Sequence, residues 1–382
     1  MNAQSILENV QEVSHQFAQE RRERQTRREL VMADFDQLKA AGLPLTGVLA
    51  DHGGMWKSVS QSTRSICELL RVVAHGDSSV ALVCAMHPSV LSFWLATTDV
   101  PPAAQAAWEA QRALCSQLAA EGAWWGTITS EPGSGGDIFQ TKAIARHDTS
   151  DSYRITGQKH FGSGSGITSF MITTAVPEGD PEPDLFFFDM RGVPWDGSEG
   201  ARLTARWDGH GMIATQSHGM QFEDFPATRI AWQGNVRKLG EAANAFISCT
   251  FAAVIVGIVE TAIETARQQL DKRRASLRAY EQVEWARVET EGWLIQQAYE
   301  GMLRAVEQKG GLALRDALLG KTAIAELAET VMGSVCRVMG GGTYARHSPF
   351  GFWFEDVRAL GFLRPPWALA YDQLFQRSWS MP

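Results

Sequence analysis

Apolar residues recur at helical spacing through the first third of the chain. Ser58–Val73 and the more apolar Ser78–Leu95 each predict a helix, and the second is expected to be the more deeply buried. The charged stretch Arg21–Ala41 predicts an amphipathic helix that ends at Gly42, because glycine readily adopts the left-handed conformation that closes a helix. Residues 1–122 therefore form the first predicted domain, which is helical.

Helical spacing returns in the last part of the chain, residues 233–382. No proline occurs between Pro226 and Pro349, and helix interiors exclude proline strongly. One face of an expected helix carries Trp285, Val288, Ile295, Tyr299, Met302 and Val306. This pattern predicts long antiparallel helices in a C-terminal four-helix bundle.

The middle of the chain, residues 123–232, follows a different pattern. Short runs rich in β-branched and aromatic residues alternate with turn residues, which is typical of strands. These runs are Trp124–Thr129, Tyr153–Phe161, Phe170–Val176 and Leu185–Met190. They predict an antiparallel β domain, and the lack of strand–helix alternation disfavours a doubly wound nucleotide-binding fold. The predicted class is α+β, mostly α, with domains at 1–122, 123–232 and 233–382.

The charge balance narrows the functional classes. A net charge of −8 disfavours a nucleic-acid-binding protein, because such proteins draw much of their affinity from basic surface. No apolar run approaches the length of about 20 residues that a membrane-spanning helix needs. The N-terminal segment Met1–Gln19 is polar and has no signal-peptide core. We expect a cytoplasmic protein with neither a nucleic acid nor a membrane as partner.

Residues that bind metals are dispersed along the chain. The five cysteines form no Cys-x-x-Cys pair, and the nine histidines form no metal-ligand motif. We therefore expect neither a disulfide framework nor a metal site.

Four motifs stand out in the sequence, and the third is taken as a marker of the fold rather than as chemistry. Ser130–Asp137 reads S-E-P-G-S-G-G-D, and its glycines allow the backbone to approach a ligand closely. Y-R-I-T-G-Q-K-H-F-G-S-G follows at Tyr153–Gly164, then W-D-G-H-G-M-I-A-T-Q-S at Trp207–Ser217 and R-V-M-G-G-G-T-Y at Arg337–Tyr344. In this order, and over nearly the whole chain, the four resemble the acyl-CoA dehydrogenase family of flavoproteins.

The resemblance implies that FAD lies between the helices and the β domain. It implies that Ser130 contacts the flavin ring system, that Phe161 packs on the ring, and that Ser163 bonds to flavin N5. Gly135, Gly136 and Gly162 belong to the same two motifs and are expected in the cofactor site. Gly136 stands where the family has a serine near the acyl-CoA, so one hydroxyl is missing there.

The fourth motif implies an oligomer. In the family the corresponding element meets the FAD of a neighbouring subunit, which places Arg337, Gly340 and Gly341 at the cofactor of a partner. Arg337 replaces the usual glutamine but still donates hydrogen bonds. We therefore expect a homodimer or homotetramer.

The glutamate base of the family is absent. Its usual position falls on Arg364, and arginine cannot accept a proton. A second position that some relatives use falls near Thr250 and Phe251, neither of which is a carboxylate.

Three functions stay open. The first is FAD-dependent oxidation of an acyl thioester or related small molecule, with an electron-transfer flavoprotein as partner and Arg364 in the site. The second is a monooxygenase that uses reduced flavin, FAD or FMN, from a reductase; such enzymes need a proton donor, for which His87 and His160 are candidates. The third is a remodelled flavoprotein without dehydrogenase activity.

Overall fold

Six helices precede the strands in the computed structural model, which describes residues 1–149 and 151–379. They are α1 (Ala3–Gln19), α2 (Arg21–Arg24), α3 (Met32–Ala41), α4 (Val59–Gly76), α5 (Ser78–Leu95) and α6 (Pro102–Ala120). Helix α5 has the predicted bounds. Helix α4 begins one residue after the predicted start at Ser58, whose side chain caps it by accepting from the backbone N–H of Gln61, and it ends at Gly76 rather than Val73.

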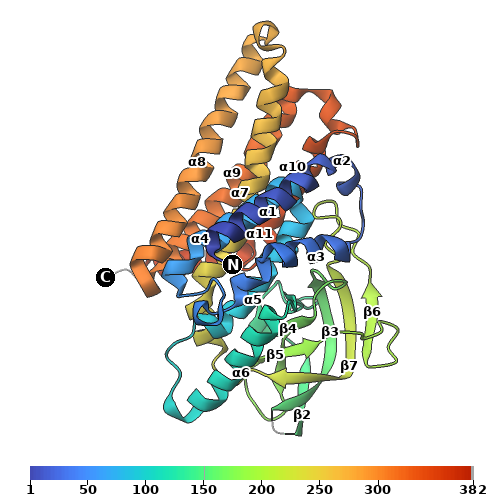
Figure 1. Ribbon diagram of the computed structural model, residues 1–382, viewed down its shortest axis with the longest axis vertical. Coiled ribbons are helices and arrows are strands. Elements are labelled where there is room, and N and C mark those ends of the chain that lie inside the picture. Colours follow the sequence, from blue (N-terminus) through green and yellow to red (C-terminus); the bar gives the residue numbers. More distant parts are fainter. Residues whose placement is uncertain (150, 380–382) are drawn as a thin grey trace.

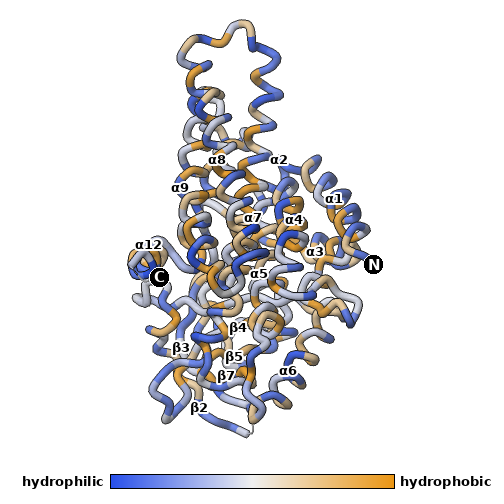
Figure 2. The backbone as a smooth tube through the Cα atoms, turned by 90° about the vertical axis from the view of Figure 1, so that its left-hand side faces the viewer, coloured by the Kyte–Doolittle hydropathy of each residue, from blue (hydrophilic) through white to orange (hydrophobic). Residues whose placement is uncertain are grey.

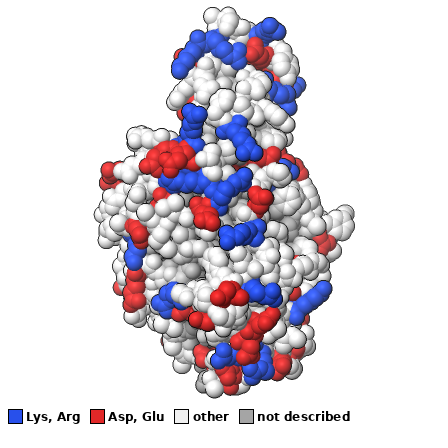
Figure 3. Space-filling model, turned by 90° about the vertical axis from the view of Figure 1, so that its right-hand side faces the viewer, with Lys and Arg blue, Asp and Glu red and all other residues white. Residues whose placement is uncertain are grey.

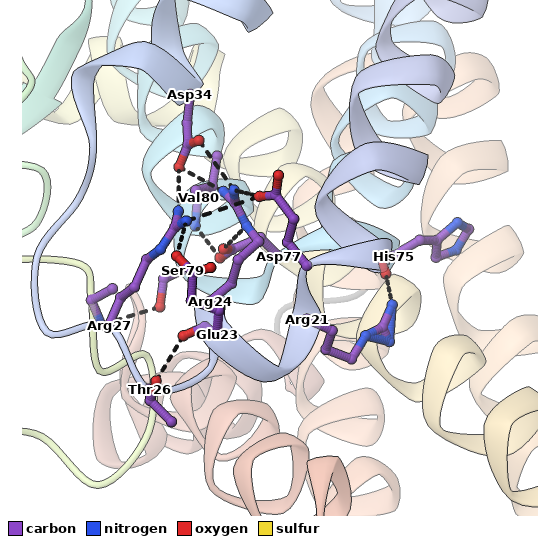
Figure 4. Close-up of polar contacts among 12 residues, drawn as sticks. Arg21, Glu23, Arg24, Thr26, Arg27, Asp34, His75, Asp77, Ser79 and Val80 are labelled. Atoms are coloured by element: carbon purple, nitrogen blue, oxygen red, sulfur yellow. Dashed lines mark hydrogen bonds and ion pairs between the residues drawn. The ribbon is translucent and has the colours of Figure 1, made fainter. Parts of the chain in front are cut away.

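The predicted helix Arg21–Ala41 is wrong in one respect, because the structure divides it into α2 and α3. The chain turns between them so that Arg24 can pair with Asp34 across the break, as Figure 4 shows. Helix α3 ends at Gly42 as predicted, with φ of 97° in the left-handed region.

The middle of the chain forms one seven-stranded sheet. Its strands are β1 (Trp125–Thr127), β2 (Ile144–Thr149), β3 (Ser152–Gly162), β4 (Phe170–Pro177), β5 (Asp184–Asp189), β6 (Ala201–Ala205) and β7 (His218–Arg229). The order is β1-β4-β2-β3-β7-β5; β4 also pairs with β5, and β6 with β7, so the sheet closes on itself around a separate aromatic core. The antiparallel prediction fails for β4, which runs parallel to both β1 and β2.

Three long helices and three short ones follow. They are α7 (Val236–Asp271), α8 (Ala279–Lys309), α9 (Ala313–Met339), α10 (Pro349–Val357), α11 (Ala359–Phe362) and α12 (Trp367–Ser378). Helix α7 packs against α4 and α5 as well as α8 and α9, so the helix bundle draws on both ends of the chain. Figure 1 shows these helices above the strands, and Figure 2 shows the α7–α8 hairpin extending beyond the rest.

The expectation that no apolar run approaches the length of a membrane-spanning helix is wrong for two helices. By length and composition, α5 and α7 would each be apolar enough to cross a membrane. The share buried inside the protein is 89% for the apolar window of α5 and 78% for that of α7, as is usual for core helices. Such burial leaves little apolar surface on either helix for lipid to contact.

Candidate functional site

The structure brings the first two motifs side by side. The backbone N–H of His160 donates to the carbonyl oxygen of Ser130 at 2.8 Å, and Thr127 forms an antiparallel bridge with Ser163. The segment after β1 therefore lies along the end of β3. This pairing brings the segments that carry Ser130 and Ser163 side by side, although 33 positions separate the two residues.

The glycine loop after Ser130 is open on one side. Gly133, Gly135 and Gly136 have φ values of 79°, 59° and 84°, which only glycine adopts without strain. A Cβ added at Gly133 or Gly135 would meet nothing within 4 Å, whereas one at Gly136 would lie 2.8 Å from Pro366. The loop thus offers free backbone for a ligand, and Gly136 allows close packing of the C-terminal segment.

A buried ion pair supports this loop from beneath. Lys159 donates from Nζ to Glu131 at 2.5 Å and to Thr141 at 3.0 Å, and its side chain is fully buried. The Thr141 hydroxyl and the backbone N–H of Lys142 also donate to Glu131. Burial alone would raise the pKa of Glu131, but these bonds outweigh it and hold the pKa below its usual range. The Glu131 carboxylate is therefore ionised and fully engaged.

Phe161 is an exposed aromatic ring on a strained backbone. Its φ is 58° and 59% of its surface is exposed, with Trp207 and His160 packed edge-on against the ring. A left-handed conformation costs a residue with a Cβ about 1–2 kcal/mol. Strain of this kind concentrates at ligand sites, which agrees with the predicted stacking position.

A chain of buried hydroxyls runs inward from Ser163. Ser163 Oγ lies 2.8 Å from Ser217 Oγ, which lies 2.7 Å from Thr215 Oγ1, and Thr215 donates to the carbonyl oxygen of Met212 at 2.8 Å. The N–H of Met212 donates to Asp356 of α10 at 2.6 Å. The sequence predicts only a fold marker at Trp207–Ser217, although the spaced hydroxyls at 215 and 217 are visible in it.

Arg364 reaches the same place from the C-terminal end. The guanidinium donates from Nη1 to the carbonyl oxygen of Gly136 at 2.7 Å and from Nη2 to Ser130 Oγ at 3.3 Å. Lys321 holds the segment by donating to the carbonyl oxygens of Leu363 and Pro365, at 3.0 and 2.8 Å. Burial lowers the pKa of Arg364 to about 10, so the side chain is still a cation at neutral pH.

His87 lies in the core rather than in this site. Its Nδ1 accepts from the N–H of Trp125 at 3.2 Å, so Nε2 carries the proton that is donated to the Pro44 carbonyl oxygen at 2.9 Å. Burial lowers the pKa of His87 to about 4. The ring is neutral and both nitrogens are engaged, so the proposed site does not include this candidate proton donor.

Arg337, Gly340 and Gly341 lie far from the loop within the chain. Arg337 pairs with Glu284 at 2.9 Å, and Arg273 donates to the Val338 carbonyl oxygen, which places the segment near the α7–α8 connection. Figure 1 draws that connection at the end of the molecule opposite the strands, and Figure 3 shows Lys and Arg side chains gathered there. The structure therefore does not join the fourth motif to the first two within one chain.

A groove of about 610 Å³ lies elsewhere, between α4 and α8. Its arginines are paired, Arg64 with Glu300 and Glu307, and Arg71 with Glu68 and Glu260. Because these charges are mutually paired, neither arginine is left free to bind an anionic ligand in the groove.

Solved structures share this architecture. A structure of KijD3 in complex with FMN and dTDP-3-amino-2,3,6-trideoxy-4-keto-3-methyl-D-glucose superposes with a TM-score of 0.81, covering 100% of this chain and 94% of that one at 19% identity. The chain has the acyl-CoA dehydrogenase-like fold. The resemblance noted in the sequence is confirmed at this level, as is the mostly helical α+β class.

Two relatives of this chain are found by sequence. Dibenzothiophene monooxygenase of Mycolicibacterium goodii is 26% identical over 246 residues, which are 61% of this chain and 54% of the relative. The amino sugar nitrososynthase DnmZ of Streptomyces peucetius is 26% identical over 247 residues, 60% of this chain and 59% of the relative. The match thus spans little more than half of each relative, and no protein-family model matches the chain.

Proposed function

We propose that this protein is a flavin-dependent monooxygenase that uses reduced FMN and oxygen. Two comparisons support the proposal: the relative from Mycolicibacterium goodii is named a monooxygenase, and KijD3, which shares the fold, binds FMN. This proposal prefers the second of the three functions drawn from the sequence, and FMN over FAD.

The observation that carries the proposal is the contact between Arg364 and Ser130. A dehydrogenase of this fold needs a base to remove a proton from the substrate. The residue at the usual position of that base is Arg364, a cation that donates a hydrogen bond to Ser130. The neighbouring carboxylate, Glu131, is committed to Lys159 and the loop backbone. Acyl-thioester oxidation therefore lacks its proton acceptor at this position.

The residues present fit a flavin. The loop carrying Gly133 and Gly135 leaves free backbone, the ring of Phe161 is exposed for stacking, and Ser130 and Ser163 supply polar contacts at either side. We assign the flavin ring system to the surface between the glycine loop and Phe161. Arg337, Gly340 and Gly341 of a second copy would then contact the phosphate of the cofactor.

Reduced FMN, when bound, supplies the two electrons with which one atom of O₂ passes to the substrate while the other leaves as water. The residues of this chain hold the cofactor in place. Arg364 places a positive charge beside Ser130, and the trio of Glu131, Lys159 and Thr141 keeps the loop rigid. His160, whose ring packs against Phe161 at the rim, is the proposed proton donor.

The proposed substrate is a small molecule with an oxidisable sulfur or nitrogen atom. Dibenzothiophene contains a sulfur atom, and a nitroso group forms on nitrogen, so both relatives are named for chemistry at such an atom. A separate flavin reductase is the proposed partner, because reduced FMN must be delivered to the site.

An isotope experiment tests the function. Purified protein is supplied with FMN, a flavin reductase, NADH and ¹⁸O₂, together with dibenzothiophene or a dTDP-amino sugar. We expect one ¹⁸O atom in the product by mass spectrometry, and no product without the reductase. Anaerobic bleaching of bound oxidised flavin by an acyl-CoA would instead establish a dehydrogenase and overturn the proposal.

A further inference from the structure

The segment around Arg364 is held by two cations that have no acidic partner. Lys321 donates to the backbone carbonyl oxygens on either side of Arg364, at 3.0 and 2.8 Å. Arg364 itself donates to the carbonyl oxygen of Gly136 at 2.7 Å and to Ser130 Oγ at 3.3 Å. All four acceptors are uncharged, and no carboxylate lies within ion-pair distance of either cation among residues 1–149 and 151–379.

The nearby acidic side chains are engaged elsewhere. Glu131 accepts from Lys159 and from the loop backbone. Asp137 acts on Arg364 from beyond ion-pair distance, and its carboxylate accepts from the N–H of Phe139 at 2.9 Å. A cation that leaves water is normally balanced by an anion, because its desolvation is costly. The positive charge at this place therefore has no counter-ion within the described part of the chain.

A ligand can reach Arg364 but not Lys321. Lys321 is 2% exposed, and burial lowers its pKa to about 8 with no anion to oppose the shift. Arg364 and Ser130 are partly exposed, and Arg364 has further N–H groups besides the two that are bonded. The hydroxyl proton of Ser130 and the N–H of Gly135 have no acceptor among the described residues. Free donors beside an unbalanced cation are the groups that bind an oxyanion.

We infer that the substrate of this protein carries an acid group, a carboxylate or a phosphate, which binds to Arg364 and Ser130. The inference rests on the proposed function, which requires a small molecule with an oxidisable sulfur or nitrogen atom, and it adds the charge of that molecule. Arg364 is then a specificity-determining residue, because a planar guanidinium matches the oxygens of a carboxylate or phosphate. Lys321 is a positioning residue, because it holds the backbone on both sides of Arg364.

A matched pair of sulfides tests the inference by binding alone. The anion para-methylthiobenzoate and its neutral methyl ester share the same aryl sulfide and differ in charge at neutral pH. Isothermal titration calorimetry measures both dissociation constants, with and without oxidised FMN, and without reductase or NADH. We expect the wild-type protein to bind the acid about tenfold or more tightly than the ester, the value of a charge-assisted hydrogen bond.

Variants assign the preference to particular residues. Arg364→Met removes the cation and should reduce the preference to about threefold or less, whereas Arg364→Lys keeps a positive charge and should retain part of it. Lys321→Met should weaken binding of the acid more than binding of the ester, because a purely structural loss would affect both probes alike. Arg358→Met is the control, since Arg358 is 44% exposed and pairs with Glu355 at 2.7 Å, and it should leave the preference unchanged.

Three results would overturn the inference. They are a wild-type protein that does not bind the acid, equal affinity for acid and ester, and a preference that survives in Arg364→Met. A loss of affinity for FMN but not for riboflavin in Arg364→Met would also overturn it, because Arg364 would then bind the cofactor phosphate. The isotope experiment reads the proposed function separately: an acid preference without oxygenation of either sulfide would overturn that function and leave the charge selectivity standing.

Discussion

Phe161 combines an exposed aromatic ring with a backbone conformation that favours glycine. Side-chain packing in the free protein does not account for it, since 59% of the residue is exposed. Met212 and Gln216, which precede Ser217 in the chain, also have positive φ, at 50° and 47°. Strain gathered around one site indicates that ligand binding, rather than stability, maintains these conformations.

Replacing Phe161 separates its two properties. Phe161→Ala and Phe161→Gly both remove the ring and should weaken FMN binding by up to about tenfold, the upper value of an aromatic stacking contact. Only glycine relieves the backbone strain, so Phe161→Gly should be more stable than Phe161→Ala by about 1 kcal/mol. Fluorescence titration and chemical unfolding measure the two effects. Equal stability of the two variants would show that the φ of Phe161 carries no strain.

Asp356 gives the protein a predicted pH dependence. Burial, reinforced by Asp77 and Glu355, raises the pKa of this carboxyl from 3.8 to about 7, although the N–H of Met212 donates to it. Between those two values the folded protein binds a proton that the unfolded chain does not, so folding stability should fall as the pH rises through this window.

Asp356→Asn tests this dependence. The amide resembles the protonated carboxyl, so the variant should lose the decline in stability between pH 5 and 8 and be the more stable protein at pH 8. The full effect of the carboxyl is on the order of 4 kcal/mol. Urea unfolding of both proteins across the range measures it; parallel pH profiles would contradict the assignment.

At the scale of elements, the turn between α2 and α3 depends on one buried cation. The side chain of Arg24 is 2% exposed and bonds to Asp34 at 2.6 Å and to Asp77 at 2.9 Å (Figure 4). These contacts join three segments of the N-terminal helices. The helical pattern of Arg21–Ala41 does not reveal them, because a charged residue in a sequence looks the same whether it is buried or exposed.

Arg24→Ala should destabilise the protein by about 3–5 kcal/mol, because it removes the buried cation from Asp77 and leaves Asp34 with Arg27 alone, at 3.3 Å. Arg28→Ala is a matched control, since Arg28 is 53% exposed and lies 3.7 Å from Asp208, and it should change stability by less than about 1 kcal/mol. Thermal or urea unfolding compares the variants. Similar losses in both would show that the Arg24 cluster is not the source of stability.

The sequence predicts some of the strands and misses others. Aromatic and β-branched runs predicted β1, β3, β4 and β5 to within two residues at either end. β2, β6 and β7 were not predicted, since Ile144–Thr149 and Ala201–Ala205 are largely exposed and polar and His218–Arg229 contains Pro226. Pairing with neighbours, rather than their own composition, makes these segments strands.

At the scale of the whole molecule, the two halves of the predicted cofactor site lie apart. Arg364 contacts Ser130 beside the end of β3, whereas Arg337 pairs with Glu284 near the connection between α7 and α8. Figures 1 and 2 show that this connection is at the end of the molecule away from the strands. Helix α7, with 36 residues, extends about 54 Å at 1.5 Å per residue.

If the site is shared between copies, FMN affinity should depend on protein concentration. We expect it to weaken on dilution below the dissociation constant of the oligomer, as measured by analytical ultracentrifugation beside FMN titration. Arg337→Ala should weaken binding about tenfold or more, the value of a charge-assisted hydrogen bond. Arg287→Ala is the control, because Arg287 also pairs with Glu284 but lies outside the fourth motif. Binding by a stable monomer would contradict a shared site.

The sequence by itself determined the helical and strand-forming segments, the fold class and the residue types around the candidate site. Periodic burial and turn chemistry are local, so α5 and the glycine loop could be predicted from a few neighbouring residues. Only the tertiary structure decided what each polar group contacts. Arg364 meets Ser130 across 234 positions, and Asp356 meets Met212 across 144. Hydrogen-bond partners and burial depend on contacts between residues far apart in the sequence, and a local sequence pattern does not contain those contacts.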